Sequence, residues 1–159
     1  MIAILATTLA LQSAPADPGG HWGSFSRSPA LRLMSTTIDV GTLGFDRKKG
    51  RLEYWLRRTV VQRGRTTIEW ANSQTCPSVR PVLGKMQRLP VPPLGVPGYS
   101  GEGNIVLDGI GYSLKAPSLY GTISFDSNVG TPLAEWVEAS LKALETCWTG
   151  RMPQRVDRR

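Results

Sequence analysis

LEYWLRRTVVQRGRTTIEWA, residues 52–71, is the stretch that decides the fold. Its first part, 52–62, and its last part, 66–71, are rich in the aromatic and β-branched residues that favour strands. Arg63-Gly64 stands between them, and glycine allows the backbone the positive φ of a tight turn. The stretch therefore predicts an antiparallel β-hairpin.

The register of this hairpin follows from the position of its turn. With Arg63-Gly64 at the turn, Gln62 lies opposite Arg65 and Arg57 lies opposite Trp70. One face then carries Trp55, Arg57, Ile68 and Trp70, and the other carries Tyr54, Leu56, Val60 and Ala71. Neither face is polar throughout, so we expect either a sheet covered at least partly on both sides or an aromatic face left exposed for binding.

Further strands are expected on both sides of the hairpin. Residues 34–40 alternate apolar and polar side chains with the period of two that marks a half-buried strand. Asp108-Gly109 separates the apolar runs 104–107 and 110–116, which predicts a second hairpin. Residues 120–125 follow as another strand.

A first helix is predicted by apolar residues that recur at helical spacing. The stripe consists of Cys76, Val79, Leu83 and Met86. Thr75 is a suitable N-cap for this helix. Pro81 would interrupt it, unless the helix begins at Ser78 and the proline falls in the first turn.

A second helix is predicted from Pro132 to Trp148. Thr131 is its N-cap, Pro132 occupies the first helical position, and Gly150 ends it. Its apolar face consists of Leu133, Trp136, Val137, Ser140, Leu141, Leu144 and Cys147. Charged residues occupy the opposite face, so we expect the apolar face to pack on the sheet.

Strands followed by a helix occur twice, which predicts an α+β domain: an antiparallel, hairpin-rich β-sheet of about six strands with two helices packed on it. Cys147 lies on the buried face of the second helix, and Cys76 lies on the apolar stripe of the first. We therefore expect these two cysteines to be bonded, with Cα atoms about 4.4–6.8 Å apart. The alternative is two separate buried thiols. No element is assigned to the Gly- and Ser-rich stretch 19–28.

The two ends of the chain are expected to lie outside this domain. The apolar run Ile2–Leu11 is about half as long as a membrane span, and Ala14-Pro15-Ala16 follows it with the pattern that signal peptidase recognises. We predict a signal peptide over 1–16, cleaved near Ala16, a single domain over 17–150 and a disordered basic tail over 151–159. The protein would then be exported to the periplasm or the medium. Because no Lys or Arg precedes the apolar run, a cytosolic chain with a buried N-terminal element is the alternative.

The formal net charge of +7 is unevenly distributed along the chain. Arg47–Arg65 carries eight Lys and Arg residues against Glu53 alone, and the tail 151–159 carries four Arg against one Asp. The rest of the chain is slightly acidic. The local basicity predicts a surface for anionic partners. Export argues against nucleic acid and favours an anionic envelope component, such as lipopolysaccharide phosphates, acidic glycans or phospholipid head groups.

Motifs for catalysis, cofactors and metals are missing from the sequence. Its only histidine is His21, and it has neither a phosphate-binding glycine loop nor clustered metal-ligating residues. No cofactor or metal is therefore expected. The remaining enzymatic interpretation is a small hydrolase that works with carboxylates alone, drawn from Glu53, Glu69, Asp108 and Asp126.

The leading functional hypothesis is an exported, non-enzymatic module that binds an anionic envelope component through its basic and aromatic hairpin. The candidate binding residues are Trp55, Arg57, Arg63, Arg65 and Trp70, because guanidinium groups beside tryptophan rings suit phosphate or carboxylate ligands. The alternative is a solvated basic face above two core tryptophans. Another hypothesis is an inhibitor or assembly partner of other envelope proteins that presents the Pro-rich loop 89–103.

Overall fold

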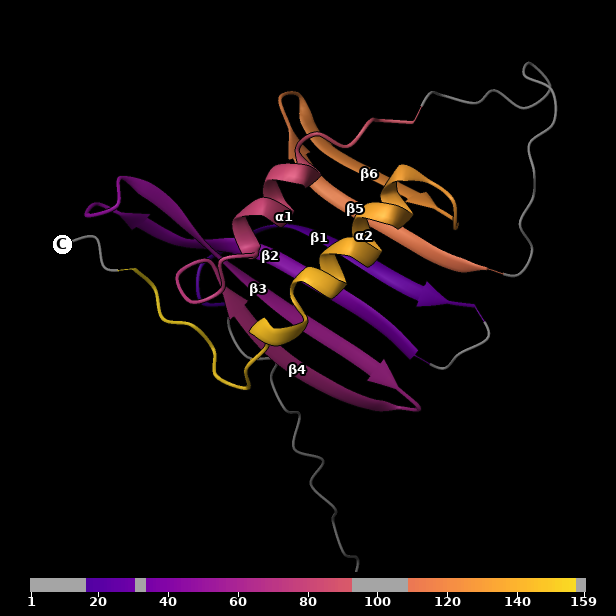
Figure 1. Cartoon of the computed structure of the whole chain (residues 1–159), viewed down its shortest axis with the longest axis horizontal. Helices are drawn as coiled ribbons and strands as arrows, with labels where there is room; N and C mark the ends of the chain where they lie inside the picture. Colours follow the sequence, from indigo (N-terminus) through magenta and orange to yellow (C-terminus); the bar gives the residue numbers. More distant parts are fainter. Residues whose placement is uncertain (1–16, 31–33, 93–108, 157–159) are drawn as a thin grey trace, which may run out of the picture.

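The computed structural model describes residues 17–30, 34–92 and 109–156 (Figure 1). Their six strands form one antiparallel sheet in the order β4-β3-β2-β1-β5-β6. The strands are β1 (Gly20–Pro29), β2 (Met34–Asp46), β3 (Arg51–Gln62), β4 (Arg65–Asn72), β5 (Ile110–Ser118) and β6 (Gly121–Ser127). Together with two helices and one disulfide, this sheet confirms the predicted α+β fold.

The β3–β4 hairpin has the register predicted from its sequence. Arg57 pairs with Trp70, and Gln62 pairs with Arg65. The two turn residues, Arg63 and Gly64, have φ values of 48° and 76°. Two successive positive φ values match the twist of the flanking strands, so this local turn fixes the pairing of the whole hairpin.

Strand β1 is a central strand of the sheet, although no element was assigned to its Gly- and Ser-rich sequence. It pairs with β2 on one side and β5 on the other. Phe25 is buried towards the helices, while the alternate residues Ser24, Ser26 and Ser28 line the opposite face. Serine and glycine have weak strand propensity, so the pairing of two neighbouring strands holds this segment extended.

Both helices lie on the same face of the sheet (Figure 1). Helix α1 (Val79–Met86) follows Ser78 as its N-cap, so Pro81 falls in the first turn and Thr75 lies outside the helix. The proline is tolerated there, because the backbone N–H that it lacks would have no acceptor within the helix in the first turn.

Helix α2 (Pro132–Ala143) begins as predicted, since the Thr131 side chain accepts a hydrogen bond from the backbone N–H of Ala134. Its end is earlier than the predicted Trp148. The chain tightens after Ala143 into a short 3₁₀ turn, η1 (Glu145–Cys147), a common way to satisfy the last carbonyls of a helix.

The main core lies between the helices and this face of the sheet. Phe25 of β1 meets Trp136 of α2 edge to face, with ring centroids 4.7 Å apart. The Trp136 indole N–H also donates to the carbonyl oxygen of Val82 at 3.2 Å, which joins the two helices. Cys76 and Cys147 form the predicted disulfide, with Cα atoms 5.6 Å apart.

A second, smaller cluster lies on the opposite face and consists of Leu43, Trp55 and Trp70. The chain reaches it after η1, where Thr149 and Trp70 exchange two backbone hydrogen bonds, and Val156 then packs against the cluster. The sheet is thus covered partly on both sides, the first of the two expectations. Disorder was expected from residue 151, but residues 151–156 run beside the sheet because Val156 buries apolar surface there.

Some predicted segments lie outside the described residues. They are the signal peptide 1–16, the strand 104–107 with Asp108, residues 93–103 of the Pro-rich loop, and the last residues 157–159. Within the described residues, no helix is long and apolar enough to cross a membrane.

Candidate functional site

The aromatic part of the predicted binding surface lies inside the protein. Trp55 is fully buried and Trp70 is 4% exposed. Arg57 passes 5.8 Å from the centre of the Trp70 ring, but its guanidinium hydrogen-bonds Asp39 at 2.9 Å and Asp17 at 2.6 Å. The positive charge of Arg57 is therefore met by two carboxylates, which leaves little of it for an external anion.

Arg63 and Arg65 lie elsewhere, in the exposed β3–β4 turn. Six residues of strand separate Arg57 from Arg63, a distance of about 20 Å at the usual rise per residue. The structure therefore does not bring the predicted binding residues together. Trp55, Trp70 and the charge-paired Arg57 form one group, and Arg63 and Arg65 lie apart from it in an exposed turn.

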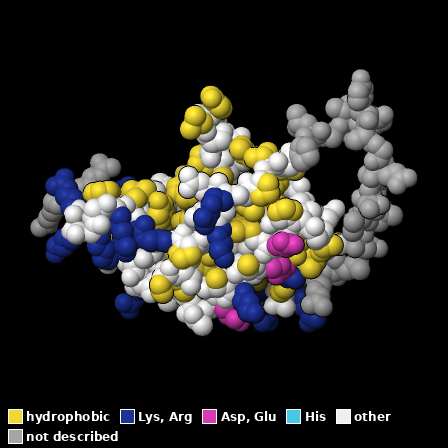
Figure 2. Space-filling view, turned by 45° about the horizontal axis from the view of Figure 1, so that its top comes forward, with side chains coloured by type: hydrophobic (Ala, Val, Ile, Leu, Met, Phe, Trp, Pro, Cys, Tyr) yellow, Lys and Arg dark blue, Asp and Glu magenta, His cyan; other side chains and the backbone are white. Residues whose placement is uncertain are grey.

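A different cluster of basic residues lies at the other end of β3, in the β2–β3 turn. We call it the basic tip, and it consists of Phe45, Arg47, Lys48, Lys49, Arg51 and Leu52. Figure 2 shows Lys and Arg side chains gathered over this turn beside hydrophobic ones. Phe45 is 49% exposed and Leu52 is 38% exposed, so apolar surface and positive charge meet in solvent.

The turn of the basic tip is held by Asp46. One oxygen of its carboxylate accepts hydrogen bonds from the backbone N–H groups of Lys48 and Lys49, at 3.0 and 3.2 Å. Its other oxygen lies 3.6 Å from the Lys49 ammonium group. Asp46 therefore shapes the turn and offsets one charge, while Arg47 and Lys48 have no carboxylate partner within the described residues.

Behind the basic tip lies Glu53, whose carboxylate is fully buried. It accepts hydrogen bonds from the Ser73 hydroxyl, from Arg51 at 3.1 Å and from Arg80 at 2.9 Å. Burial opposes its ionisation, but these three hydrogen bonds and the charge of Arg80 outweigh burial and lower the pKa of the Glu53 carboxyl. Glu53 thus anchors the base of the tip as a carboxylate.

A second charged group joins α2 to the sheet. Glu138 accepts hydrogen bonds from the Tyr112 hydroxyl and from Arg27, both at 2.6 Å. Burial raises the pKa of Tyr112 and the bond to Glu138 raises it further, while the pKa of Glu138 is lowered because the two donors outweigh its burial. The arrangement fixes α2 on β1 and β5.

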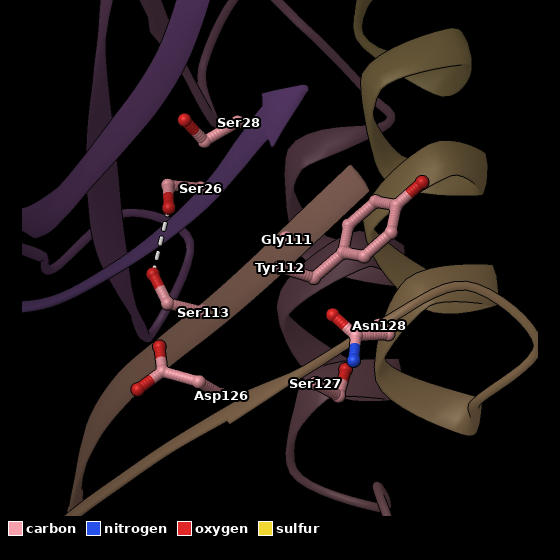
Figure 3. A pocket seen from close by; sticks show the side chains of 8 residues that line it. All are labelled: Ser26, Ser28, Gly111, Tyr112, Ser113, Asp126, Ser127 and Asn128. Carbon is pink, nitrogen blue, oxygen red and sulfur yellow. Dashed lines mark hydrogen bonds between the residues drawn. The ribbon is translucent and has the colours of Figure 1, made fainter. Parts of the chain in front are cut away.

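The opposite face of the sheet carries a row of small hydroxyl side chains around a hollow of about 410 Å³. In Figure 3, Ser26 and Ser113 point towards each other, while the Tyr112 ring points away towards α2. The Ser26 and Ser113 hydroxyls are 2.6 Å apart. Among the described residues of its lining, Asp126 is the one carboxylate, and there is no histidine or lysine, the bases that usually activate a serine.

A larger hollow is an apolar groove of about 750 Å³ between α1 and the β5–β6 hairpin. Its floor includes Leu83 of α1, Leu114 of β5 and Phe125 of β6. Of the described residues that line it, Arg80 alone is charged. The sequence does not predict this groove, because its lining residues come from a helix and several strands that only the fold brings together.

The carboxylates considered for hydrolysis are dispersed. Glu53 lies five residues along β3 from Arg58, the partner of Glu69, so the two glutamates are about 16 Å apart. Asp126 lies on β6, at the opposite edge of the sheet from Glu69 on β4. These separations exceed the roughly 10 Å that a glycosidase pair uses, and Asp108 lies outside the described residues.

His21 lies on β1 with its Nε2 3.5 Å from Asp39. Among the described residues, no group of three or more His, Cys, Asp or Glu residues is placed to hold a metal ion. Comparison with known proteins found no matching family model, no matching curated protein and no matching solved structure.

Proposed function

We propose that this protein is exported and binds the surface of an anionic membrane through the basic tip. The observation that carries the proposal is the combination of exposed Phe45 and Leu52 with neighbouring Arg and Lys side chains that have few acidic partners. Basic residues are attracted to anionic lipid head groups, and exposed apolar side chains enter the boundary below them.

The apolar component favours a membrane over a soluble polyanion. A soluble polyanion attracts positive charge but has no hydrocarbon layer that Phe45 and Leu52 could enter together. The β5–β6 turn lies at the same end of the sheet, because β5 pairs antiparallel with β1. It adds apolar surface there, since Leu119 and Tyr120 are more than 90% exposed. In Figure 1 the β2–β3 turn lies to the left of α1 and the β5–β6 turn lies above it.

Export is supported by the Cys76–Cys147 disulfide. Disulfides persist in oxidising compartments and are rare in the reducing cytosol. An exported protein would meet anionic lipid at the membrane surfaces of the envelope. The basic tip and the disulfide therefore fit the same location.

The test is co-sedimentation with vesicles of phosphatidylglycerol and phosphatidylcholine. A triple variant, Arg47→Gln, Lys48→Gln and Lys49→Gln, should bind roughly a hundredfold more weakly, because each basic residue near an anionic surface adds about one kcal/mol. The matched control removes the same charge elsewhere, with Arg63→Gln, Arg65→Gln and Lys142→Gln. It should stay within about threefold of the unchanged protein.

The apolar contribution is tested separately with Phe45→Ser, which leaves the charge intact. We expect about tenfold weaker binding to vesicles and unchanged retention on heparin resin, since heparin offers charge alone. Equal losses in the two triple variants would mean that only net charge matters. A larger loss in the control would place the surface at Arg63 and Arg65, and either result would overturn the proposal.

A further inference from the structure

The apolar groove has the size and lining of a small-molecule site. Its volume of about 750 Å³ lies within the roughly 300–1,000 Å³ of typical ligand pockets. Apolar side chains from α1 and from β1, β3, β5 and β6 form most of its wall. They include Trp22, Leu83, Met86, Leu114, Ile123 and Phe125. An elongated apolar molecule would exclude water from this wall, and the flexible Met86 can adapt to its shape.

The groove also has a charged side. Arg80 lines it and lies beside the Tyr54 ring, with its guanidinium carbon 5.5 Å from the ring centre. No acidic residue is present among the described residues of the lining. An anionic group would therefore be attracted to Arg80 and would meet no opposing carboxylate among them.

The charge of Arg80 is only partly compensated. Glu53 is its carboxylate partner, but the same carboxylate also binds Arg51, so two guanidinium groups share one negative charge. The buried Nε–H of Arg80 has no hydrogen-bond acceptor within the described residues. A buried donor without an acceptor is costly, so the protein leaves this guanidinium partly unsatisfied. The Arg80 side chain is 29% exposed, and a carboxylate or phosphate can reach its exposed part.

From these observations we infer that the groove binds a single-chain amphiphile with an anionic head group. The alkyl chain would lie along the apolar wall, and a carboxylate or phosphate would meet Arg80. This inference goes beyond membrane-surface binding and does not depend on it, because no residue of the basic tip other than the neighbouring Arg51 takes part in the charge balance.

The first experiment measures binding of lauric acid by isothermal titration calorimetry, with lauryl alcohol and dodecylamine as matched probes. We expect lauric acid to bind at one equivalent and at least about tenfold more tightly than either probe, because only its head group is anionic. Lysophosphatidylglycerol is the second anionic probe, and the tighter of the two identifies a free acid or a lipid head group as the source. Absence of binding by both anionic probes would overturn the inference.

Gly84 allows the groove to be blocked without disturbing the core. It lies in the wall of the groove, and a Cβ there would meet no atom within 4 Å. Gly84→Trp should fill the groove and weaken lauric acid binding by more than about tenfold, whereas Gly84→Ala should bind within about twofold of the unchanged protein. Unaltered binding by the tryptophan variant would exclude the groove as the site.

Arg80→Gln tests the head-group contact. It should abolish the preference for lauric acid over lauryl alcohol while the alcohol still binds, a pattern that general unfolding would not produce. The vesicle assay separates this inference from the proposed function. The triple variant of the basic tip should still bind lauric acid, and Gly84→Trp should still bind vesicles. A retained preference in Arg80→Gln would contradict the assigned role of Arg80.

Discussion

Gly41 has no side chain, and this allows the cluster of Leu43, Trp55 and Trp70 to pack against the sheet. The Trp55 indole lies against the backbone of Gly41, and a Cβ there would stand 2.3 Å from the Trp55 ring and 2.5 Å from the carbonyl oxygen of Gly20. Trp55 is fully buried and the Gly20 oxygen belongs to the backbone, so neither can move away cheaply. Gly41 therefore permits β1, β2 and Trp55 to pack closely.

Gly41→Ala is expected to lower the free energy of unfolding by about 1–3 kcal/mol, as overpacking of a dense core does. Urea denaturation measures the change. Gly84→Ala is the matched control, since its Cβ enters open space in a helix and should raise stability by about 0.5–1 kcal/mol. An unchanged urea midpoint for Gly41→Ala would show that Trp55 is not packed as described.

Glu53 is expected to make folding sensitive to acid. Because its pKa is lower in the folded protein than in the unfolded chain, its contribution to stability is present at neutral pH. That contribution is lost as the pH falls below the ordinary pKa of glutamate towards the lower folded value. Glu138 contributes in the same direction.

Glu53→Gln should therefore be less stable than the unchanged protein at neutral pH and should lose less stability on acidification. Thermal unfolding followed across this pH range measures both effects. Glu135→Gln, which removes an exposed carboxylate of α2, controls for the change in net charge. Parallel pH profiles for Glu53→Gln and the unchanged protein would contradict the role given to the buried carboxylate.

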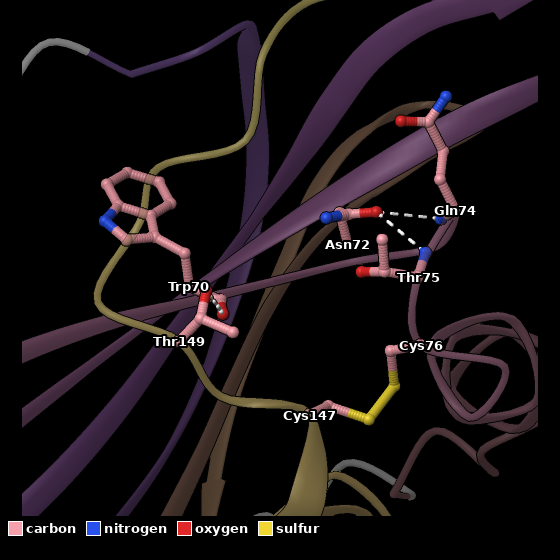
Figure 4. The surroundings of a disulfide bond; sticks show 7 residues. All are labelled: Trp70, Asn72, Gln74, Thr75, Cys76, Cys147 and Thr149. Carbon is pink, nitrogen blue, oxygen red and sulfur yellow. Dashed lines mark hydrogen bonds between the residues drawn. A yellow bond between two sulfur atoms is a disulfide. The ribbon is translucent and has the colours of Figure 1, made fainter.

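At the scale of elements, the disulfide joins the turn that precedes α1 to the end of η1 beside the edge of the sheet. Figure 4 shows Cys76 following the turn that Asn72 stabilises, and Cys147 close to Thr149 at the β4 edge. Asn72 accepts hydrogen bonds from the backbone N–H groups of Gln74 and Thr75, at 2.9 and 3.0 Å. The bond thus holds both helices and the start of the C-terminal segment in one place.

Replacing both cysteines by alanine should lower the free energy of unfolding by about 4 kcal/mol, given a sequence separation of 71 residues. The sheet should survive, because its hairpins and the Phe25–Trp136 contact do not depend on the bond. Circular dichroism and urea denaturation of the double variant check both statements. Loss of the native spectrum in the absence of denaturant would contradict the second.

The accuracy of the sequence predictions depended on how local the determining interactions are. The β3–β4 hairpin and the start of α2 were predicted correctly because a turn and an N-cap act over a few neighbouring residues. Strand β1 was missed because its neighbours in the sheet, and not its own propensity, hold it extended. The earlier end of α2 depends on how the chain turns towards the β4 edge, which is a tertiary effect.

The candidate site was predicted only in part for the same reason. The charge count located the basic residues in Arg47–Arg65, and the structure divides them mainly between the two turns at the ends of β3. It did not show that Trp55 and Trp70 are buried, or that Arg57 is paired with Asp17 and Asp39. Both facts depend on which face of the sheet the N- and C-terminal segments cover, and no short stretch of sequence predicts that.

At the scale of the whole molecule, the two faces and two ends of the sheet have different roles. One face carries the helices and the main core, and the other is covered near Trp55 and carries small hydroxyl side chains elsewhere. The basic tip and the β5–β6 turn share one end of the sheet, while the β3–β4 turn lies at the other. A planar membrane surface would therefore engage one end of the molecule.

Amide hydrogen exchange, with and without phosphatidylglycerol vesicles, tests this most directly. We predict slower exchange of the backbone amides of residues 45–52 when vesicles are added, because the basic tip then lies in the lipid boundary and is shielded from water. The amides of residues 62–66, in the β3–β4 turn that carries Arg63 and Arg65 at the opposite end, should exchange at an unchanged rate. Slower exchange at 62–66, or no change at 45–52 under conditions where the protein binds the vesicles, would contradict the proposed orientation.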